Sequence, residues 1–342
     1  MTTPSRPEGT PDPTLVFGTL SAYQRTAALR AAIEIDLFRA LGEGLGDVAG
    51  LARRLKASER GIRILCDALT VLGLITKSGE RYAHSATSAL FLDPASPACL
   101  AATARFMTRP EVRGSFDQLA EAVRNGRTAL PGAGTVEPEN PIWVEFAHSM
   151  APMMGAMAVP LAAIVAGDRK GPIRILDIAA GHGLFGIAFA RQNREARITA
   201  VDWAPVLEVA KANARKAEVA DRLDTIPGSA FDVPFGGPYD VALLTNFLHH
   251  FDRATCVGLL RKVHAALAPG GVVAALEFVP NEDRISPEAP ALFSLVMLAT
   301  TATGDAYTGR ELESMYVEAG FGKVEVQPVP DSPETVVTGR KG

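Results

Sequence analysis

The stretch DIAAGHGLFG, residues 177–186, decides the fold of this chain because it joins an apolar, β-branched run to a helical one. A glycine-rich turn in that position is typical of nucleotide-binding α/β proteins. Gly181, Gly183 and Gly186 match the pattern GxGxxG. Asp202 ends the next predicted strand, where its carboxylate can accept hydrogen bonds from ribose hydroxyls. The turn therefore predicts a cofactor site at the carboxyl ends of parallel strands.

On the carboxyl-terminal side of this turn, apolar runs alternate with helical runs. The predicted strands are residues 173–178, 197–201, 223–226, 239–244 and 272–278, with helices ending near 192 and spanning 205–217 and 253–267. This alternation predicts a parallel sheet with helices on both faces. A helix over 310–319 precedes two strands, 323–329 and 335–339, which are too close together for a helical connection and form an antiparallel hairpin. We expect an α/β fold with a Rossmann-like, seven-stranded sheet.

The amino-terminal half has a different, mainly helical pattern. One helical run ending at Gly42, short helices over 47–55 and 59–72, and a hairpin over 74–83 predict a winged-helix-like unit. Its basic residues fit a solvated helix face better than a DNA-reading one, and its apolar surface favours dimerisation. The expected domains are a disordered tail (1–14), the dimerisation domain (15–105), connecting helices that line the pocket (106–167) and a catalytic domain (168–342).

Charge and cysteine content exclude several classes of partner. The 342 residues include 34 Lys and Arg against 38 Asp and Glu, a net charge of −4, so a nucleic-acid partner is not expected. Cys66, Cys99 and Cys256 are far apart and lack zinc-site spacing, so neither disulfides nor a metal is predicted. Because the amino terminus also lacks a secretory signal, a cytoplasmic location fits best.

Residues 146–167 carry no formal charge and are long enough to cross a bilayer. Pro152 and Pro160 interrupt this run, and four methionines crowd its first half. We expect a buried helix that lines a pocket rather than a membrane span, because methionine side chains fill irregular apolar sites.

Two cofactor classes fit the glycine-rich turn: a nicotinamide dinucleotide and S-adenosylmethionine. Asp177 lies on the strand just before the turn, where a carboxylate suits a cationic group and would repel a pyrophosphate. The turn also lies far from the start of the chain, and the terminal hairpin replaces a second mononucleotide-binding half. S-adenosylmethionine is therefore favoured, with a nicotinamide-dependent oxidoreductase as the alternative.

A series of short motifs makes this prediction more specific. The motifs are FAHSM (146–150), DIAAGHG (177–183), VDW (201–203), GSAFDVPF (228–235), NFLHHFD (246–252), LAPGG (267–271) and EFVP (277–280). In this order and spacing, the chain resembles the S-adenosylmethionine-dependent O-methyltransferases of the plant caffeate type and their bacterial relatives in secondary metabolism. The similarity covers most of the chain, and it implies a homodimer formed through the amino-terminal domain.

The resemblance also implies a set of cofactor-binding residues. Asp177, Gly181 and Gly183 match the motif around the methionine part, and Asp202 matches the ribose-binding acid. Trp203 is a candidate to stack on adenine. Ser229 and Ala230 stand where the family commonly has an acid and a methionine, which weakens the expected adenine contact. Phe231 and Asn246 complete the expected cofactor site.

The chemistry is expected to depend on a histidine. Methyl transfer to oxygen needs a positioned nucleophile and a base to remove its proton. His249 matches the family's catalytic base, and Glu277 matches the glutamate that orients it. The family's second supporting acid is replaced by Ala306, with Asp305 beside it. This departure keeps N- or C-methylation, or cofactor binding without methyl transfer, as alternatives.

The acceptor pocket is expected to combine both halves of the chain. Apolar side chains in the run 146–167 and in the uncharged run 289–304 suit an aromatic or polyketide-like small molecule. The candidate acceptor-binding residues are Phe146, Met150, Met154, His250, Phe293 and Met297.

Overall fold

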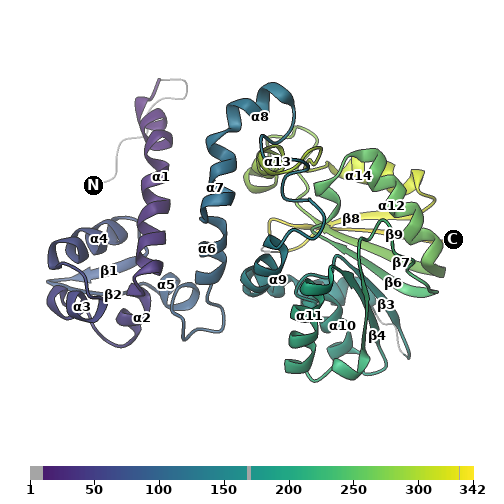
Figure 1. Ribbon diagram of the computed structural model, residues 1–342, viewed down its shortest axis with the longest axis horizontal. Coiled ribbons are helices and arrows are strands. Elements are labelled where there is room, and N and C mark those ends of the chain that lie inside the picture. Colours follow the sequence, from purple (N-terminus) through teal and green to yellow (C-terminus); the bar gives the residue numbers. More distant parts are fainter. Residues whose placement is uncertain (1–10, 168–170, 331) are drawn as a thin grey trace. The chain divides into compact units, whose positions relative to one another are not determined.

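The computed structural model describes residues 11–167, 171–330 and 332–342, and it divides into two compact units, Met1–Thr108 and Arg109–Gly342 (Figure 1). The expected tail, residues 1–14, lies mostly outside the described residues. The first helix begins at Pro13, inside that expected tail.

The first unit has the expected order of helices followed by a hairpin. It contains α1 (Pro13–Glu34), α2 (Leu37–Gly42), α3 (Val48–Leu55), α4 (Glu59–Val71), β1 (Ile75–Ser78), β2 (Arg81–His84), α5 (Ala86–Phe91) and α6 (Ala101–Met107). Strands β1 and β2 are antiparallel. The side chains of Asp47 and Ser58 cap α3 and α4 by accepting hydrogen bonds from the backbone N–H groups of Gly50 and Gly61.

The prediction of one helical run ending at Gly42 is wrong. The chain breaks between α1 and α2 at Asp36, whose φ of 65° is left-handed and therefore incompatible with a continuous helix. Apolar spacing alone could not show this break because both helices bury their apolar side chains in one core, which includes Ile33 and Phe38.

The second unit contains the expected seven-stranded sheet. Its strand order is β5 (Leu223–Pro227), β4 (Arg197–Asp202), β3 (Arg174–Ile178), β6 (Tyr239–Thr245), β7 (Leu267–Glu277), β9 (Thr335–Arg340) and β8 (Gly322–Pro328). The first five strands are parallel, whereas β9 is antiparallel to both of its neighbours. The α/β fold and its carboxyl-terminal hairpin are confirmed.

Helices cover both faces of this sheet (Figure 1). On one face, α10 (Leu184–Gln192) and α11 (Ala204–Lys216) pack on β3 to β5. On the other face, α12 (Arg253–Ala266) and α14 (Gly309–Glu318) bury Leu260 and Tyr316 in a core with β6, β7 and β9. Because both faces are covered, the carboxyl ends of the parallel strands are left as the usual ligand-binding position of an open α/β sheet.

The remaining helices of this unit are α7 (Pro110–Asp117), α8 (Leu119–Asn125), α9 (Ile142–Ala166) and α13 (Glu288–Thr300). By length and composition alone, α9 is able to cross a membrane. In the structure it packs against α10 and α11, and its buried residues include Met154 and Leu161. Both prolines of the run lie inside the continuous helix.

Candidate active site

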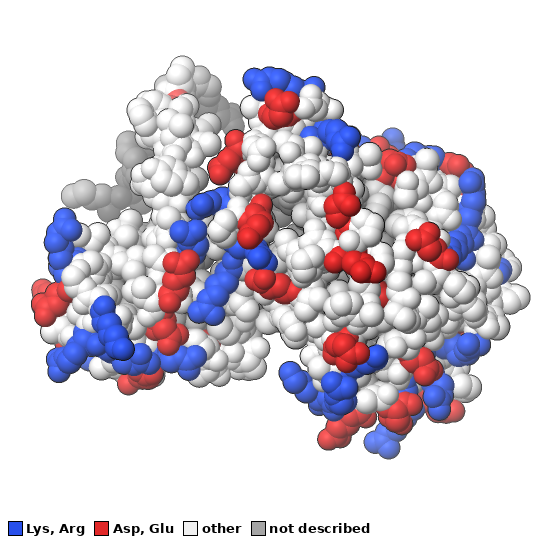
Figure 2. Space-filling view, in the orientation of Figure 1, with Lys and Arg blue, Asp and Glu red and all other residues white. Residues whose placement is uncertain are grey.

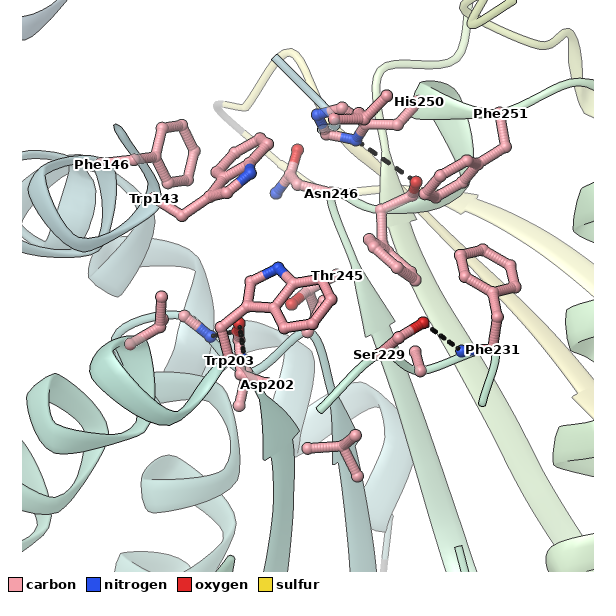
Figure 3. A pocket seen from close by; sticks show the side chains of 18 of the residues that line it. Trp143, Phe146, Asp202, Trp203, Ser229, Phe231, Thr245, Asn246, His250 and Phe251 are labelled. Atoms are coloured by element: carbon pink, nitrogen blue, oxygen red, sulfur yellow. Dashed lines mark hydrogen bonds between the residues drawn. The ribbon is translucent and has the colours of Figure 1, made fainter. Parts of the chain in front are cut away.

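A cavity of about 640 Å³ opens at the carboxyl edge of the parallel strands, within the second unit (Figure 3). Strands β3, β4 and β6 end at its floor, and α9 forms part of its wall. Its lining is mostly apolar and aromatic, and it includes Trp143, Phe146, Met154, Ala179, Gly181, His182, Asp202, Trp203, Ser229, Ala230, Phe231, Asn246, Phe247, His250 and Phe251. The structure thus brings most of the residues predicted for the cofactor to one cavity.

The glycine turn between β3 and α10 forms one side of the cavity. Gly181 lines it, but Gly183 does not. A Cβ atom on Gly183 would lie 2.8 Å from the Cβ of Ala210, and the residue has a φ of 72°. Gly183 therefore permits the close approach of α11, and its expected contact with the cofactor stays a prediction.

Asp177 is also absent from the cavity lining. The side chain is fully buried behind the turn, where its Oδ2 accepts a hydrogen bond of 3.1 Å from the Gly186 N–H. Burial and, to a smaller extent, the neighbouring Asp202 carboxylate raise the pKa of Asp177 to about 7, against the effect of the Gly186 hydrogen bond. The hydrogen bond to Gly186 directs one oxygen toward α10, while Oδ1 has no hydrogen-bond partner among the described residues, so the expected contact with a cationic group stays a prediction.

Asp202 lies at the end of β4 with its carboxylate in the cavity. Its Oδ2 accepts a hydrogen bond of 2.8 Å from the Gly181 N–H, and its Oδ1 accepts one of 2.7 Å from the Trp203 N–H. Burial raises the pKa of Asp202 to about 6, and the two backbone donors oppose that rise. Each oxygen keeps a further lone pair for a ligand hydroxyl.

Aromatic rings enclose the space next to Asp202. The Trp203 side chain projects into the cavity from the end of β4 (Figure 3). Phe231, Phe247 and Phe251 form a cluster with ring centroids 4.9 to 6.2 Å apart. Ser229 Oγ accepts a hydrogen bond of 3.1 Å from the Phe231 N–H, which fixes this turn. A flat heterocycle such as adenine fits between such walls.

Unpaired polar atoms support the fit of S-adenosylmethionine to this cavity. Within the described parts of the chain, four buried side-chain polar atoms have no hydrogen-bond partner. Two of them belong to residues of the cavity lining, His182 Nε2 and Asn246 Nδ2, and a third, Asp177 Oδ1, lies behind the glycine turn. Buried polar groups are usually paired, so this concentration indicates a polar ligand. The cofactor offers ammonium, carboxylate and hydroxyl groups to them.

His249 and Glu277 form a buried pair next to the cavity-lining residues Phe247 and His250, and neither member of the pair lines the cavity itself. His249 lies on η2 (Leu248–His250) after β6, and Glu277 ends β7. His249 Nδ1 bonds to Glu277 Oε2. Glu277 Oε1 accepts hydrogen bonds of 3.0 and 2.8 Å from the N–H groups of Phe247 and Leu248. The carboxylate therefore fixes the ring and leaves Nε2 to accept a proton.

His250, rather than His249, lines the cavity at this end. The centroids of the two rings are 4.3 Å apart. His250 Nδ1 lies 3.3 Å from the carbonyl oxygen of Phe247, and burial together with the charge of His249 lowers its pKa well below the usual value. His250 is therefore a neutral ring whose second nitrogen can contact a ligand.

The acceptor end also contains a residue that the sequence did not single out. Trp143, near the start of α9, makes edge contacts with Phe146 and His250 at centroid distances of 5.3 and 5.5 Å (Figure 3). Its only sequence signal is a rare tryptophan three positions before Phe146. Trp143, Phe146 and Met154 together make α9 the apolar wall of the acceptor end.

Three residues expected in the acceptor pocket are not part of the cavity wall. Met150 and Met297 are buried in helix packing. Phe293 on α13 packs against the His249 ring at 4.8 Å and stacks on Phe278 at 4.2 Å. Apolar residues of a core helix satisfy the same sequence pattern as pocket residues, so a contact of these three residues with an acceptor stays a prediction.

The structure also shows where Ala306 and Asp305 lie, the two residues at the position of the family's second acid. Ala306 is fully buried, and Asp305 pairs with Arg284 at 3.2 Å on the surface of the unit. Asp305 therefore does not replace the missing acid. Among the described residues, no group of three or more His, Cys, Asp or Glu side chains is placed to hold a metal ion.

Comparison with known protein families agrees with this geometry. A family model of the O-methyltransferase domain matches residues 116–322, which include the whole cavity lining. A second model, of the O-methyltransferase dimerisation domain, matches residues 17–94.

Two named relatives are similar along nearly their full length. The 3-hydroxy-5-methyl-1-naphthoate 3-O-methyltransferase of Streptomyces sahachiroi is 32% identical over 318 residues, covering 91% of this chain and 90% of that protein. The tetracenomycin polyketide synthesis 8-O-methyltransferase TcmO of Streptomyces glaucescens is 28% identical over 326 residues, covering 94% of each.

Solved structures share the complete fold. A Nostoc punctiforme protein, proposed to be an O-methyltransferase, superposes with a TM-score of 0.93 and 48% identity, covering 97% of this chain and all of the other. Human N-acetylserotonin methyltransferase, solved with S-adenosylmethionine, has a TM-score of 0.84 and 23% identity, covering 98% of this chain and all of the other.

Proposed function

The chain belongs to the O-methyltransferase family, whose cofactor is S-adenosylmethionine, and on this premise we propose that it methylates a hydroxyl group of an aromatic, polyketide-like molecule with His249 as general base. The observation that carries the proposal is the buried pair of His249 and Glu277 at the acceptor end of the cavity.

The proposed reaction is a direct displacement. When bound, S-adenosylmethionine supplies an electrophilic methyl group on a positively charged sulfur. His249 Nε2 takes the hydroxyl proton as the new oxygen–carbon bond forms and the sulfur–carbon bond breaks. Glu277 stabilises the resulting imidazolium through Nδ1, and the cavity walls hold the acceptor in line.

His249 is a better candidate for the base than His250, although His250 lines the cavity. A general base needs a partner that stabilises its protonated form. His249 has Glu277, whereas the Nδ1 of His250 faces only the Phe247 carbonyl oxygen. Because burial holds the pKa of His250 well below its usual value, that ring is suited to contact the acceptor but not to retain its proton.

The cofactor end is proposed to bind S-adenosylmethionine through five elements. Asp202 would accept hydrogen bonds from the ribose, Trp203 and Phe231 would enclose the adenine, and Asn246 and the Gly181 turn would face the methionine part. Ala230 lines the adenine side as a small apolar contact. Ser229 would contribute mainly through the turn that it holds.

The acceptor class follows from the walls and from the relatives. A cavity of about 640 Å³ lined by Trp143, Phe146 and Met154 has room for a cofactor and a flat ring system. The two Streptomyces relatives are named for a hydroxynaphthoate and for tetracenomycin, which supports a hydroxylated fused-ring acceptor for this chain.

A homodimer is proposed to form through the amino-terminal unit, in the cytoplasm. Residues 13–24 of α1 carry no charge, and Leu15, Phe17, Leu20 and Tyr23 are 64 to 75% exposed. Figure 2 shows this part of α1, at the upper left, as almost entirely white. An apolar face of this kind needs a covering partner. The three free cysteines suit a reducing compartment.

The test is an acceptor screen with the full chain. Dihydroxynaphthalenes, hydroxynaphthoates and hydroxyanthraquinones are incubated with S-adenosylmethionine, alongside aliphatic alcohols and arylamines of similar size. We expect S-adenosylhomocysteine to form only when a phenol is the acceptor, and we expect the methyl ether of that phenol to form at the same time. Transfer only to the amines, or binding of the cofactor with no product from any acceptor, would refute the proposal.

A further inference from the structure

A third buried acid, Glu334, lies at the edge of the sheet where β7 ends with Glu277. It directly precedes β9, whose first residue, Thr335, is the register partner of Glu277 on β7. The Glu334 residue is only 7% exposed. A glutamate from the carboxyl-terminal hairpin therefore reaches the same edge of the sheet as the proposed base.

The local backbone holds Glu334 in place. Its N–H donates to Ser332 Oγ at 3.1 Å, and its carbonyl oxygen accepts a hydrogen bond of 3.2 Å from the Val329 N–H. The turn is therefore held by hydrogen bonds of the Glu334 backbone, and the Glu334 carboxyl is not needed to stabilise it. Within the described residues, Glu334 forms no salt bridge, unlike the exposed Asp305, which pairs with Arg284.

The groups that act on the Glu334 carboxyl are those of the active site. Burial raises its pKa to about 7, the Asn246 amide opposes this rise, the Glu277 charge adds to it, and His249 opposes it. Asn246 lines the cavity with a φ of 53°, and its Nδ2 has no partner of normal hydrogen-bond geometry. Asn246 is thus a residue of the cavity wall that also acts on the Glu334 carboxyl.

We propose that Glu334 is a positioning residue of the base: in its ionised form, it stabilises the imidazolium of His249 from the side of Asn246 and β9. This inference rests on the proposed function of His249. It supplies from the carboxyl-terminal hairpin the second carboxyl that neither Ala306 nor Asp305 provides. No additional bond is made or broken, because the proton taken from the acceptor stays on His249 Nε2 until it leaves to solvent.

The test follows the His249 ring itself, so that it needs no acceptor. The full chain, labelled with ¹⁵N-histidine and saturated with S-adenosylhomocysteine, is titrated from pH 5 to 9 by long-range ¹H–¹⁵N spectra. His249→Gln assigns the ring among the six histidines. We expect Glu334→Gln to lower the titration midpoint of His249 by about 0.5 to 1 pH unit, because an anion that favours the protonated ring is lost.

Two variants keep the test decisive. Glu334→Asp retains the negative charge, so its His249 midpoint should lie closer to the wild-type value than to the value in Glu334→Gln. This variant also tests the inference if Glu334→Gln folds poorly. Asp305→Asn, an exposed acid in a matched change, should leave the midpoint unchanged. An unaltered His249 midpoint in Glu334→Gln, or an equal shift in Asp305→Asn, would overturn the inference. An unproductive acceptor screen would leave this measurement untouched, so the two proposals fail separately.

Discussion

The two ends of the cavity are built in different ways. At the cofactor end, Asp202 and the Gly181 turn lie on neighbouring parallel strands and are held by backbone hydrogen bonds. At the acceptor end, side chains meet from segments far apart in the sequence: Trp143 on α9, His249 on η2 and Glu277 on β7. We infer that the fold itself supplies the proposed cofactor site, whereas long-range packing assembles the residues proposed for the chemistry and for the choice of acceptor.

The sharpest way to separate the two ends is to remove the base. We expect His249→Ala to lower turnover by about 10² to 10⁴, the usual contribution of one general base, with cofactor affinity within about twofold of the wild type. Product formation with the best acceptor from the screen measures the first effect, and calorimetric titration with S-adenosylhomocysteine measures the second.

His250→Ala is the matched control for this prediction. It removes a neighbouring imidazole that lines the cavity but lacks a carboxylate partner, so it should mainly raise the KM for the acceptor. A loss of turnover in His250→Ala as large as that in His249→Ala would move the base to the residue on the cavity wall.

Removing the acid at the cofactor end should weaken cofactor binding and leave the chemical step unchanged. Asp202→Ala removes charge-assisted acceptors for the ribose, and we expect cofactor binding to weaken by about 1 to 3 kcal/mol, or about 5- to 150-fold in Kd. Asp221→Ala, an exposed acid in the adjacent η1 (Ala220–Arg222), should leave Kd unchanged. Equal Kd values for Asp202→Ala and the wild type would show that the cofactor lies elsewhere.

The pH dependence of binding should also belong to the cofactor end. Because the pKa of Asp202 is raised to about 6, this carboxyl gains a proton as the pH falls through 6 and loses its strength as an acceptor. Cofactor affinity should therefore be about tenfold weaker at pH 5 than at pH 7. Asp202→Asn should bind more weakly at pH 7 but lose most of this slope; a slope equal to that of the wild type would assign it to another group.

The smallest effect is expected at the apolar wall of the acceptor end. Trp143→Ala removes an aromatic ring of the cavity wall that packs against Phe146 and His250. One aromatic contact with the acceptor is worth about 0.5 to 1.5 kcal/mol, so its loss should raise the KM for the acceptor by about two- to tenfold. Trp143→Phe should recover most of the affinity. A change in cofactor Kd instead would break the division between the two ends.

The same division explains what could be predicted from the sequence. The sheet, its terminal hairpin and the position of Asp202 follow from local patterns, since strand alternation and a glycine turn are encoded over a few residues. Trp143 and Glu334 could not be found this way, because their relevance depends on how α9 packs and on the register of β9 against β7.

Several residues predicted for the site lie outside the cavity lining because they are buried elsewhere. Met150 and Met297 have the apolar spacing of pocket residues, yet they are buried and do not line the cavity. Gly183 satisfies a cofactor motif, yet its missing side chain makes room for Ala210. Sequence spacing can place a residue on an element, but it cannot decide whether that residue faces a neighbouring helix or a cavity.

The central claim, that one end of the cavity binds the cofactor and the other removes the proton, is tested most directly by single-turnover methyl transfer. Wild type, Asp202→Ala and His249→Ala are compared with the best acceptor while the cofactor concentration is raised to saturation. We predict that Asp202→Ala returns to within about threefold of the wild-type rate, whereas His249→Ala stays at least about 10²-fold slower. A persistent defect in Asp202→Ala, or recovery of His249→Ala to within about threefold, would contradict the account.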